Sequence, residues 1–252
     1  MTQTTSSSPS LLSLAGLPYF LIAFIARLPF AMMVVGVLTV VVSARGSLSL
    51  GGLTSAAVGL GTAIVGPLLG AAADRFGQRP VLVVLAVLNS ALLALFIVVV
   101  YSDAGESLLL LSAFAVGATA PQVAPMSRSR LVTIIDDRMP EARRPKTTSA
   151  TMSYESAADE TVFVLGPFLV GILASLITPW APLALASVLI LVFVGAFALH
   201  PTGRHVSAAR HPDGSAPSRV SELFRPALLV VILGIFGVGF FFGATFPPLT
   251  SL

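Results

Sequence analysis

Long apolar runs alternate with short polar segments along this chain of 252 residues. A helix needs about 20 mostly apolar residues to cross the hydrocarbon of a bilayer, and seven runs are long enough to be considered. These runs are Leu17 to Val42, Leu53 to Ala73, Pro80 to Tyr101, Leu108 to Met126, Thr147 to Ile177, Trp180 to Leu199 and Pro226 to Leu249. The pattern predicts an all-α, polytopic membrane protein, with a six-helix bundle in residues 17–199 and a seventh transmembrane helix in residues 226–252.

The amino-acid composition agrees with a membrane protein and disfavours a soluble one. Hydrophobic residues make up 56% of the chain, charged residues make up 10%, and the mean hydropathy is +0.96. Soluble domains carry roughly 25% charged residues. The net charge of +3 does not indicate nucleic-acid binding, because the basic residues are scattered among short loops between apolar runs. The chain has no cysteine, which excludes disulfides and thiolate metal sites.

Two polar segments flank the first six runs. Residues 1–16 contain no Lys or Arg, unlike the start of a secretory signal peptide, and we expect a disordered cytoplasmic tail there. Residues 200–225 are rich in Pro, Gly, Ser and Arg and poor in large apolar residues. Such a composition is typical of a flexible linker.

Basic residues gather on one side of the predicted topology. The loops after the second, fourth and sixth runs hold twelve Lys and Arg residues, and the opposite loops hold only Arg45. The twelve are Arg75, Arg79, Arg128, Arg130, Arg138, Arg143, Arg144, Lys146, Arg204, Arg210, Arg219 and Arg225. By the positive-inside rule, the N-terminus and these three loops are cytoplasmic. We expect a multi-pass protein of a bacterial-type inner membrane.

A short charged segment, GAAADRFGQRP at residues 70–80, joins the second and third runs. Its pattern resembles the loop between helices two and three of the major facilitator superfamily. The matching residues are Gly70, Asp74, Arg75, Gly77 and Arg79. Gln78 stands where many members carry Arg, and Pro80 stands where another basic residue is common. The predicted linker also falls where this family joins its two six-helix halves.

The resemblance implies both a fold and an activity. It implies a secondary transporter that works by alternating access between two pseudo-symmetric halves, of which this chain resembles the N-terminal half and the start of the second. The implied partners are the lipid bilayer, a small-molecule substrate and protons, with the missing C-terminal half or a partner chain required. We expect proton-coupled efflux of the bacterial drug-exporter kind. Metabolite uptake on the same fold and a non-transporting truncated half-transporter are the alternatives.

The resemblance also implies that Asp74 closes a gate between the two halves. Its carboxylate would accept backbone N–H groups at a helix end and pair with an Arg on a neighbouring element. The alternative is a tight-turn residue that only fixes orientation, and Arg75 and Arg79 suit any cytoplasmic loop. Small residues share one face of the preceding helix, at Ser55, Gly59, Ala63, Gly66 and Gly70. Such a face allows close helix packing, either at the seam between the halves or inside one bundle.

The fifth run begins with a polar half that carries three carboxylates. Glu155 and Asp159 share a helix face, and Glu160 lies beside it. Charges inside a membrane segment are costly and by default indicate a proton or substrate site. At about 1.5 Å per residue, Asp159 and Arg27 lie at similar depths from the cytoplasmic side. An ion pair between the first and fifth helices is therefore geometrically possible.

Two interpretations of these carboxylates remain open. In the first, the adjacent Asp159 and Glu160 do not both ionise in a low dielectric, so one takes up a proton and couples transport to it. In the second, the helix begins later than Thr147, and Glu155 and even Asp159 are solvated charges at the membrane surface.

Further along the fifth run, the segment GPFLVG at residues 166–171 resembles a helix-five signature of many exporters in the superfamily. The match is partial, because Val170 replaces a glycine and Val162 stands where an upstream glycine is usual. Pro167 should bend the helix, and Gly166 and Gly171 should admit a close neighbour. The alternative is a kinked packing helix with no relation to export.

The fourth run ends with two prolines, Pro121 and Pro125, that loosen its cytoplasmic end. Arg128 follows them, where an arginine would meet a substrate or a carboxylate of the fifth helix. We interpret Arg130 as a positive-inside anchor and residues 136–146 as a solvated loop.

Signatures of enzymes are missing from the sequence. The three histidines, His200, His205 and His211, all fall in the predicted linker without zinc-binding spacing. The sequence contains neither a phosphate-binding loop nor a Gly-x-Ser-x-Gly nucleophile motif. We therefore expect no catalytic residues, no metal and no cofactor.

Overall fold

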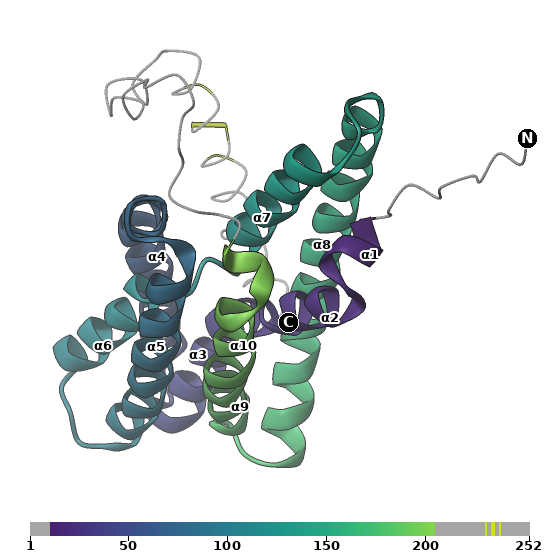
Figure 1. Cartoon of the computed structure of the whole chain (residues 1–252). Helices are drawn as coiled ribbons and strands as arrows, with labels where there is room; N and C mark the ends of the chain where they lie inside the picture. Colours follow the sequence, from purple (N-terminus) through teal and green to yellow (C-terminus); the bar gives the residue numbers. More distant parts are fainter. Residues whose placement is uncertain (1–10, 205–229, 231–232, 235–236, 238–252) are drawn as a thin grey trace, which may run out of the picture. The chain divides into compact units, whose positions relative to one another are not determined.

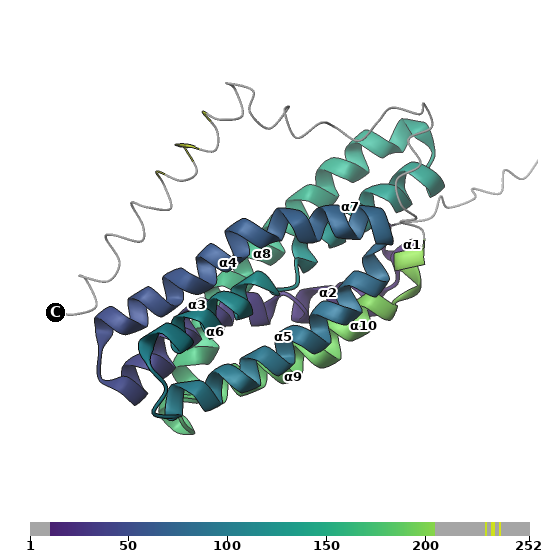
Figure 2. The same ribbon diagram turned by 90° about the vertical axis from the view of Figure 1, so that its left-hand side faces the viewer.

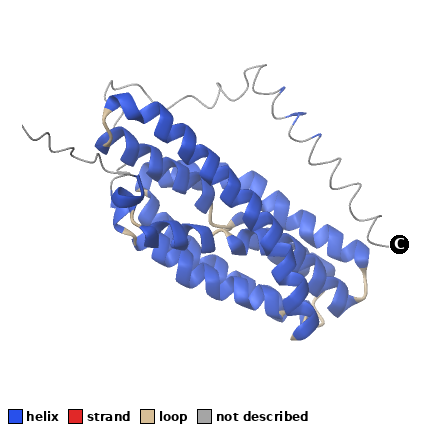
Figure 3. Ribbon diagram, turned by 90° about the vertical axis from the view of Figure 1, so that its right-hand side faces the viewer, coloured by secondary structure: helices blue, strands red, loops and turns tan. Residues whose placement is uncertain are grey.

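The computed structural model describes residues 11–204, together with residues 230, 233–234 and 237. The chain divides into two compact units, Met1–Ala209 and Arg210–Leu252. Every element described in the first unit is helical (Figures 1 and 3). The elements in chain order are α1 (Leu11–Ala15), α2 (Leu17–Ile25), α3 (Leu28–Arg45), α4 (Leu48–Phe76), α5 (Gln78–Tyr101), α6 (Glu106–Ala118), α7 (Val123–Arg138), η1 (Glu141–Arg143), α8 (Arg144–Leu176), α9 (Ala181–Leu189), η2 (Ile190–Val194), α10 (Gly195–Leu199) and η3 (Pro201–Arg204).

Six stretches of the described chain are long and apolar enough to cross a membrane. They are Leu17–Arg45, Leu48–Phe76, Gln78–Tyr101, Glu106–Arg138, Glu141–Leu176 and Ala181–Leu199. They confirm the all-α class and match the first six predicted spans. The seventh predicted helix, residues 226–252, falls largely outside the described residues, as does most of the predicted linker.

Two of the six spans are interrupted by non-helical residues, which the apolar pattern does not predict. The first breaks between α2 and α3, because Pro29 has no N–H to donate to the carbonyl of Ile25. The fourth breaks between α6 and α7, where Pro121 leaves the Gly117 carbonyl without its helical partner. The Thr62 hydroxyl of α4 donates to that carbonyl at 3.0 Å.

Four predicted boundaries need correction. Residues 11–15 form the helix α1, whose Ala15 is buried, although a disordered tail is predicted through residue 16. The fourth span continues as α7 to Arg138, so residues 136–138 are helical and not part of a loop. Residues 144–146 begin α8, and residues 201–204 form the short helix η3 at the start of the predicted linker.

The helix α3 lies between other helices of the first unit, because it packs against α4, α8 and α9. The helix α4 packs closely on α6 through two glycines. A Cβ atom on Gly117 would lie 1.9 Å from the Val58 carbonyl oxygen, and one on Gly61 would lie 2.3 Å from the Phe114 carbonyl oxygen. Only glycine allows this approach, so these two positions fix the distance between α4 and α6.

The helix α5 runs alongside α9 and α10 (Figure 2). Two serines join them reciprocally: Ser90 donates its hydroxyl to the Ser187 carbonyl, and Ser187 donates its hydroxyl to the Ser90 carbonyl at 3.0 Å. Both hydroxyl groups are thereby satisfied inside an apolar layer, where an unpaired polar group is costly.

Candidate functional site

Four charged side chains meet inside the first unit and form what we name the charge cluster. Arg27 lies between α2 and α3, Arg128 lies on α7, and Glu155 and Asp159 lie one turn apart on α8. Arg27 Nη2 is ion-paired with Glu155, and Arg27 Nη1 lies 3.4 Å from Asp159 Oδ1. Arg128 Nη2 is ion-paired with Asp159, and Arg128 Nε lies 4.0 Å from Glu155 Oε2. With all four groups ionised, the charge cluster has no net charge.

Burial differs sharply across the charge cluster. The side chains of Glu155 and Arg27 are 1% and 4% exposed, whereas those of Asp159 and Arg128 are 19% and 42% exposed. The Ser127 hydroxyl donates to Glu155 Oε1 at 3.0 Å, and the buried Tyr19 hydroxyl lies 3.0 Å from that of Ser127. Glu155 is therefore held on both oxygens, by Arg27 and by Ser127.

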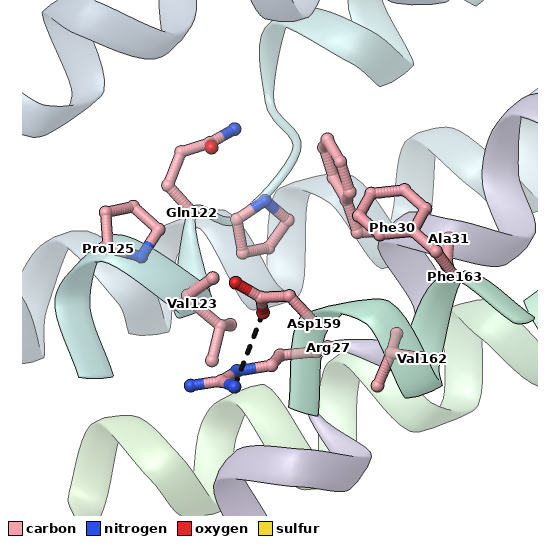
Figure 4. Close-up of a pocket in the computed structure, with 11 residues that line it drawn as sticks. Arg27, Phe30, Ala31, Gln122, Val123, Pro125, Asp159, Val162 and Phe163 are labelled. Carbon is pink, nitrogen blue, oxygen red and sulfur yellow. Dashed lines mark ion pairs between the residues drawn. The ribbon is translucent and has the colours of Figure 1, made fainter. Parts of the chain in front are cut away.

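A pocket with about 470 Å³ of empty space, open solvent included, lies beside Asp159 (Figure 4). Its walls are mostly apolar, and the rings of Phe30 and Phe163 meet there edge to face with centroids 6.4 Å apart. Arg27 and Asp159 supply the charged part of the lining. Within the described chain, no group of three or more His, Asp or Glu side chains is arranged to hold a metal ion.

The family model described as Major Facilitator Superfamily matches residues 12–252. The chain belongs to the major facilitator superfamily. No curated protein matches, and no solved structure matches. The match confirms the family expected from the sequence and identifies a multi-pass membrane transporter, which acts on small substrates in a lipid bilayer. Members of the superfamily are transporters rather than enzymes.

Both helix breaks of this superfamily protein lie at the pocket. Arg27 occupies the first break, and Pro121 and Gln122 belong to the second; all three line the pocket. Discontinuous helices at substrate sites are common in secondary transporters, because irregular backbone is tolerated in a membrane where it lines a cavity. The helix α7, which begins after the second break, carries the Arg128 that is paired with Asp159.

The three predicted carboxylates fall in different surroundings. The ion pair between the first and fifth spans is present, and α8 begins before Thr147, so Glu155 is buried rather than solvated. Asp159 joins the same charge cluster. Glu160 points away from it, is exposed, and has no hydrogen bond or ion pair with any described residue. Its adjacency to Asp159 in sequence does not become a shared site, because neighbours on a helix point about 100° apart.

The two glycines of the helix-five signature also fall in different surroundings. Gly166 is buried against α3, where a Cβ atom would lie 2.7 Å from that of Ala31, so it admits a close neighbour as predicted. Gly171 is exposed, and a Cβ atom there meets no described atom within 4 Å, so its predicted close contact is absent from the described structure. Pro167 lies inside α8, which continues through it to Leu176.

The predicted gate loop is a tight turn between α4 and α5. Gly77 has a φ of 89°, a conformation that favours glycine, and it ends α4 directly before α5 begins. Asp74, Arg75 and Arg79 are exposed, and Asp74 forms no ion pair within the described residues. Asp74 instead borders an open groove between α4 and α7. The partner expected for Asp74 is not among the residues that the structure describes.

Sequence reasoning missed the burial of Arg130. This side chain is fully buried on α7 and is not a surface anchor. Its Nε donates to Gln78 Oε1 at 2.8 Å, and its Nη1 donates to the Phe197 carbonyl at 2.6 Å. Burial, with the Arg130 guanidinium nearby, lowers the pKa of His200 below its ordinary value. No charge pattern in the sequence predicts this site, because both hydrogen-bond partners of Arg130, the Gln78 amide and the Phe197 carbonyl, are neutral.

Proposed function

We propose that this superfamily member is a secondary active transporter that works by alternating access and exports small lipophilic compounds in exchange for protons. The placement of Asp159 carries the proposal. Its carboxylate lines the pocket while it bridges Arg27 and Arg128. Ionisable groups at membrane depth are costly to keep, and by default they mark an ion or substrate pathway.

The two paired carboxylates take different parts in this proposal. Glu155 is the fixed counter-ion of Arg27, since it is almost completely buried and both of its oxygens are engaged. Asp159 is the exchangeable group, since it is more exposed and reaches the pocket. When Asp159 takes up a proton, the ion pair with Arg128 is lost, and the half-exposed Arg128 turns to water.

Exchange follows from competition for Asp159. An ionised Asp159 offers its charge to a cationic or hydrogen-bond-donating substrate whose apolar body packs against Phe30 and Phe163. A protonated Asp159 no longer attracts that substrate. Proton binding from one side then favours substrate release to the same side, which is the requirement for antiport. The partial helix-five signature at residues 166–171 supports the outward direction.

Alternating access also needs a second half, either from further chain or from a partner chain. Asp74, which has no ion pair among the described residues, and the groove beside it support a contact of the α4–α5 turn with that second half. In this proposal the contact forms in one state and breaks in the other, so Asp74, Arg75 and Arg79 act as the gate.

The test is dye accumulation in a drug-sensitive host that expresses the whole reading frame containing this chain. The expected result is exclusion of a lipophilic cationic dye, abolished by a proton uncoupler and by Asp159→Asn. The matched control is Asp137→Asn, which makes the same chemical change at an exposed position on α7 and should retain exclusion.

Other outcomes point to the alternatives. Uncoupler-sensitive accumulation of a substrate inside the cell would indicate uptake on the same fold. No transport from the whole frame, restored by a separately expressed partner half, would indicate a half-transporter. Exclusion that survives Asp159→Asn with unchanged pH dependence would remove Asp159 as the coupling group.

A further inference from the structure

Arg130 is a buried cation without a counter-ion in the described structure. Its side chain is fully buried, and none of the described ion pairs includes it. Its guanidinium instead donates to two neutral oxygens, Gln78 Oε1 and the Phe197 carbonyl, and lies over one aromatic face. The centroid of the Phe197 ring is 3.9 Å from the guanidinium carbon. Removing a charge from water is costly unless such partners satisfy it.

These contacts connect the fourth span to the start of the third span and to the end of the sixth. Arg130 lies on α7, Gln78 is the first residue of α5, and Phe197 is near the end of α10. The helix η3 closes over the remaining nitrogen, since a Cβ atom on Gly203 would lie 3.1 Å from Arg130 Nη2. A cation at the carbonyl end of α10 is also favoured by the helix dipole.

Gln78 is suited to this place because it accepts a hydrogen bond without carrying a charge. It is buried, and its amide nitrogen lies 3.4 Å from the Ser129 hydroxyl of α7. A basic residue at position 78 would instead place a second positive charge beside Arg130 and at the N-terminus of α5, both unfavourable. Gln78 directly follows Gly77, so whatever fixes Gln78 also fixes the α4–α5 turn.

We propose that Arg130 is a positioning residue for the α4–α5 turn: through Gln78 it holds the turn against α7 and α10, and it excludes a basic residue from position 78. The exposed charges of the turn, Asp74, Arg75 and Arg79, are thereby presented from a rigid base. This role concerns the six-helix unit alone and does not depend on the direction or coupling of transport.

The chain has no cysteine, so one introduced thiol reports on one place. Ala73→Cys is suitable, because Ala73 is buried and borders the groove shared with Gln78 and Ser129. The rate at which a water-soluble maleimide labels this thiol in the purified chain measures how often the turn leaves α7. Ala113→Cys, at a buried position on α6, reports opening elsewhere in the bundle.

Gln78→Leu and Arg130→Met should each raise the rate of labelling at Ala73→Cys by about tenfold. This is the change expected when a hydrogen bond to a charged group is lost. The double variant should label no faster than Arg130→Met alone, because the two residues act through each other. Gln78→Glu should label no faster than the parent, and Gln78→Arg should label fastest of the position-78 variants. Labelling at Ala113→Cys should stay constant in the position-78 series.

Arg143→Gln, which removes an exposed charge from η1, is the matched control and should not change labelling. Parental labelling in Gln78→Arg would overturn the proposal, as would effects of Gln78→Leu and Arg130→Met that multiply. Equal increases at Ala73→Cys and Ala113→Cys in Gln78→Leu would also overturn it, since they would indicate general loosening. If Arg130→Met does not fold, the position-78 series decides alone.

Discussion

Glu155 and Asp159 are separated by a single turn of α8, yet their environments differ enough to give them different tasks. Glu155 is enclosed by α2, α7 and α8, and its oxygens are engaged by Arg27 and Ser127. Asp159 lies one turn deeper along α8, where the pocket opens. Asp159 lines the pocket, whereas Glu155 does not.

This contrast predicts different effects on stability. Glu155→Gln leaves Arg27 buried with its main counter-ion removed, a change that typically costs about 3–5 kcal/mol. We expect the thermal midpoint of the purified chain to fall by roughly 6–20 °C. Asp159→Asn should lower it less, because the partner Arg128 is half-exposed. Glu160→Gln is the control: Glu160 is exposed and unpaired among described residues, so equal midpoints for Glu155→Gln and Glu160→Gln would contradict this account.

At this scale the sequence predicts charged pairs better than neutral ones. The helical rise alone brings Arg27 level with Asp159, because costly charges in a membrane segment must find each other. No comparable argument predicts the Arg130 site from the sequence. The partners of Arg130 are an amide and a backbone carbonyl that lie 52 and 67 residues away in the chain. Polar groups that pair with backbone leave no charge pattern to read.

At the scale of elements, the sequence predicts the spans but not where they break. Pro29 and Pro121 each interrupt a span, whereas Pro67 and Pro167 lie inside helices that continue through them. Proline removes the same hydrogen bond in all four places. At the break before Pro121, the Gly117 carbonyl accepts from the local Ala120 N–H and from Thr62 of another span, and a partner from another span cannot be predicted from the apolar pattern of the fourth span.

Close packing between α4 and α6 gives the second stability prediction. Gly117→Ala would place a methyl group on the Val58 carbonyl, and such overpacking costs about 1–3 kcal/mol or more. We expect loss of the folded chain or a lower thermal midpoint. Gly52→Ala in α4 is the control, since a Cβ atom there meets no described atom within 4 Å and alanine favours the helix. A Gly117→Ala protein as stable as Gly52→Ala would contradict the packing of these two helices.

At the scale of the whole molecule, the exposed small-residue face of α4 is the surface that bears on a contact with a second half. Gly59 and Ala63, within the predicted small-residue face, are exposed, and a Cβ atom on Gly59 meets no described atom within 4 Å. Ser55 is the exception, since its hydroxyl reaches the Val34 carbonyl of α3. Ordinary packing inside this bundle therefore does not explain most of that face, and a contact with the second half of the transporter remains the prediction.

The asymmetry of basic residues predicts the orientation of the whole molecule in the membrane. The single basic residue on the opposite side, Arg45, donates to carbonyls at the end of α5 and in the loop that follows, so it has a local reason to be there. The remaining loop arginines lie on the side expected to be cytoplasmic. The exposed Asp103 lies in the loop between the third and fourth spans, and the exposed Arg143 lies in η1 at the start of the fifth span, so the two residues are on opposite sides of the six spans.

Thiol labelling in intact cells tests this orientation, because the chain has no cysteine of its own. A membrane-impermeant maleimide should label Asp103→Cys from outside and should leave Arg143→Cys unlabelled until the cells are permeabilised. The physical reason is that each basic loop resists transfer across the membrane during insertion. Arg128 and Arg130 lie inside the fourth span, and the other ten basic residues of that side act together against Arg45. Labelling of Arg143→Cys in sealed cells, with Asp103→Cys protected, would invert the topology and would place the α4–α5 turn on the outer face.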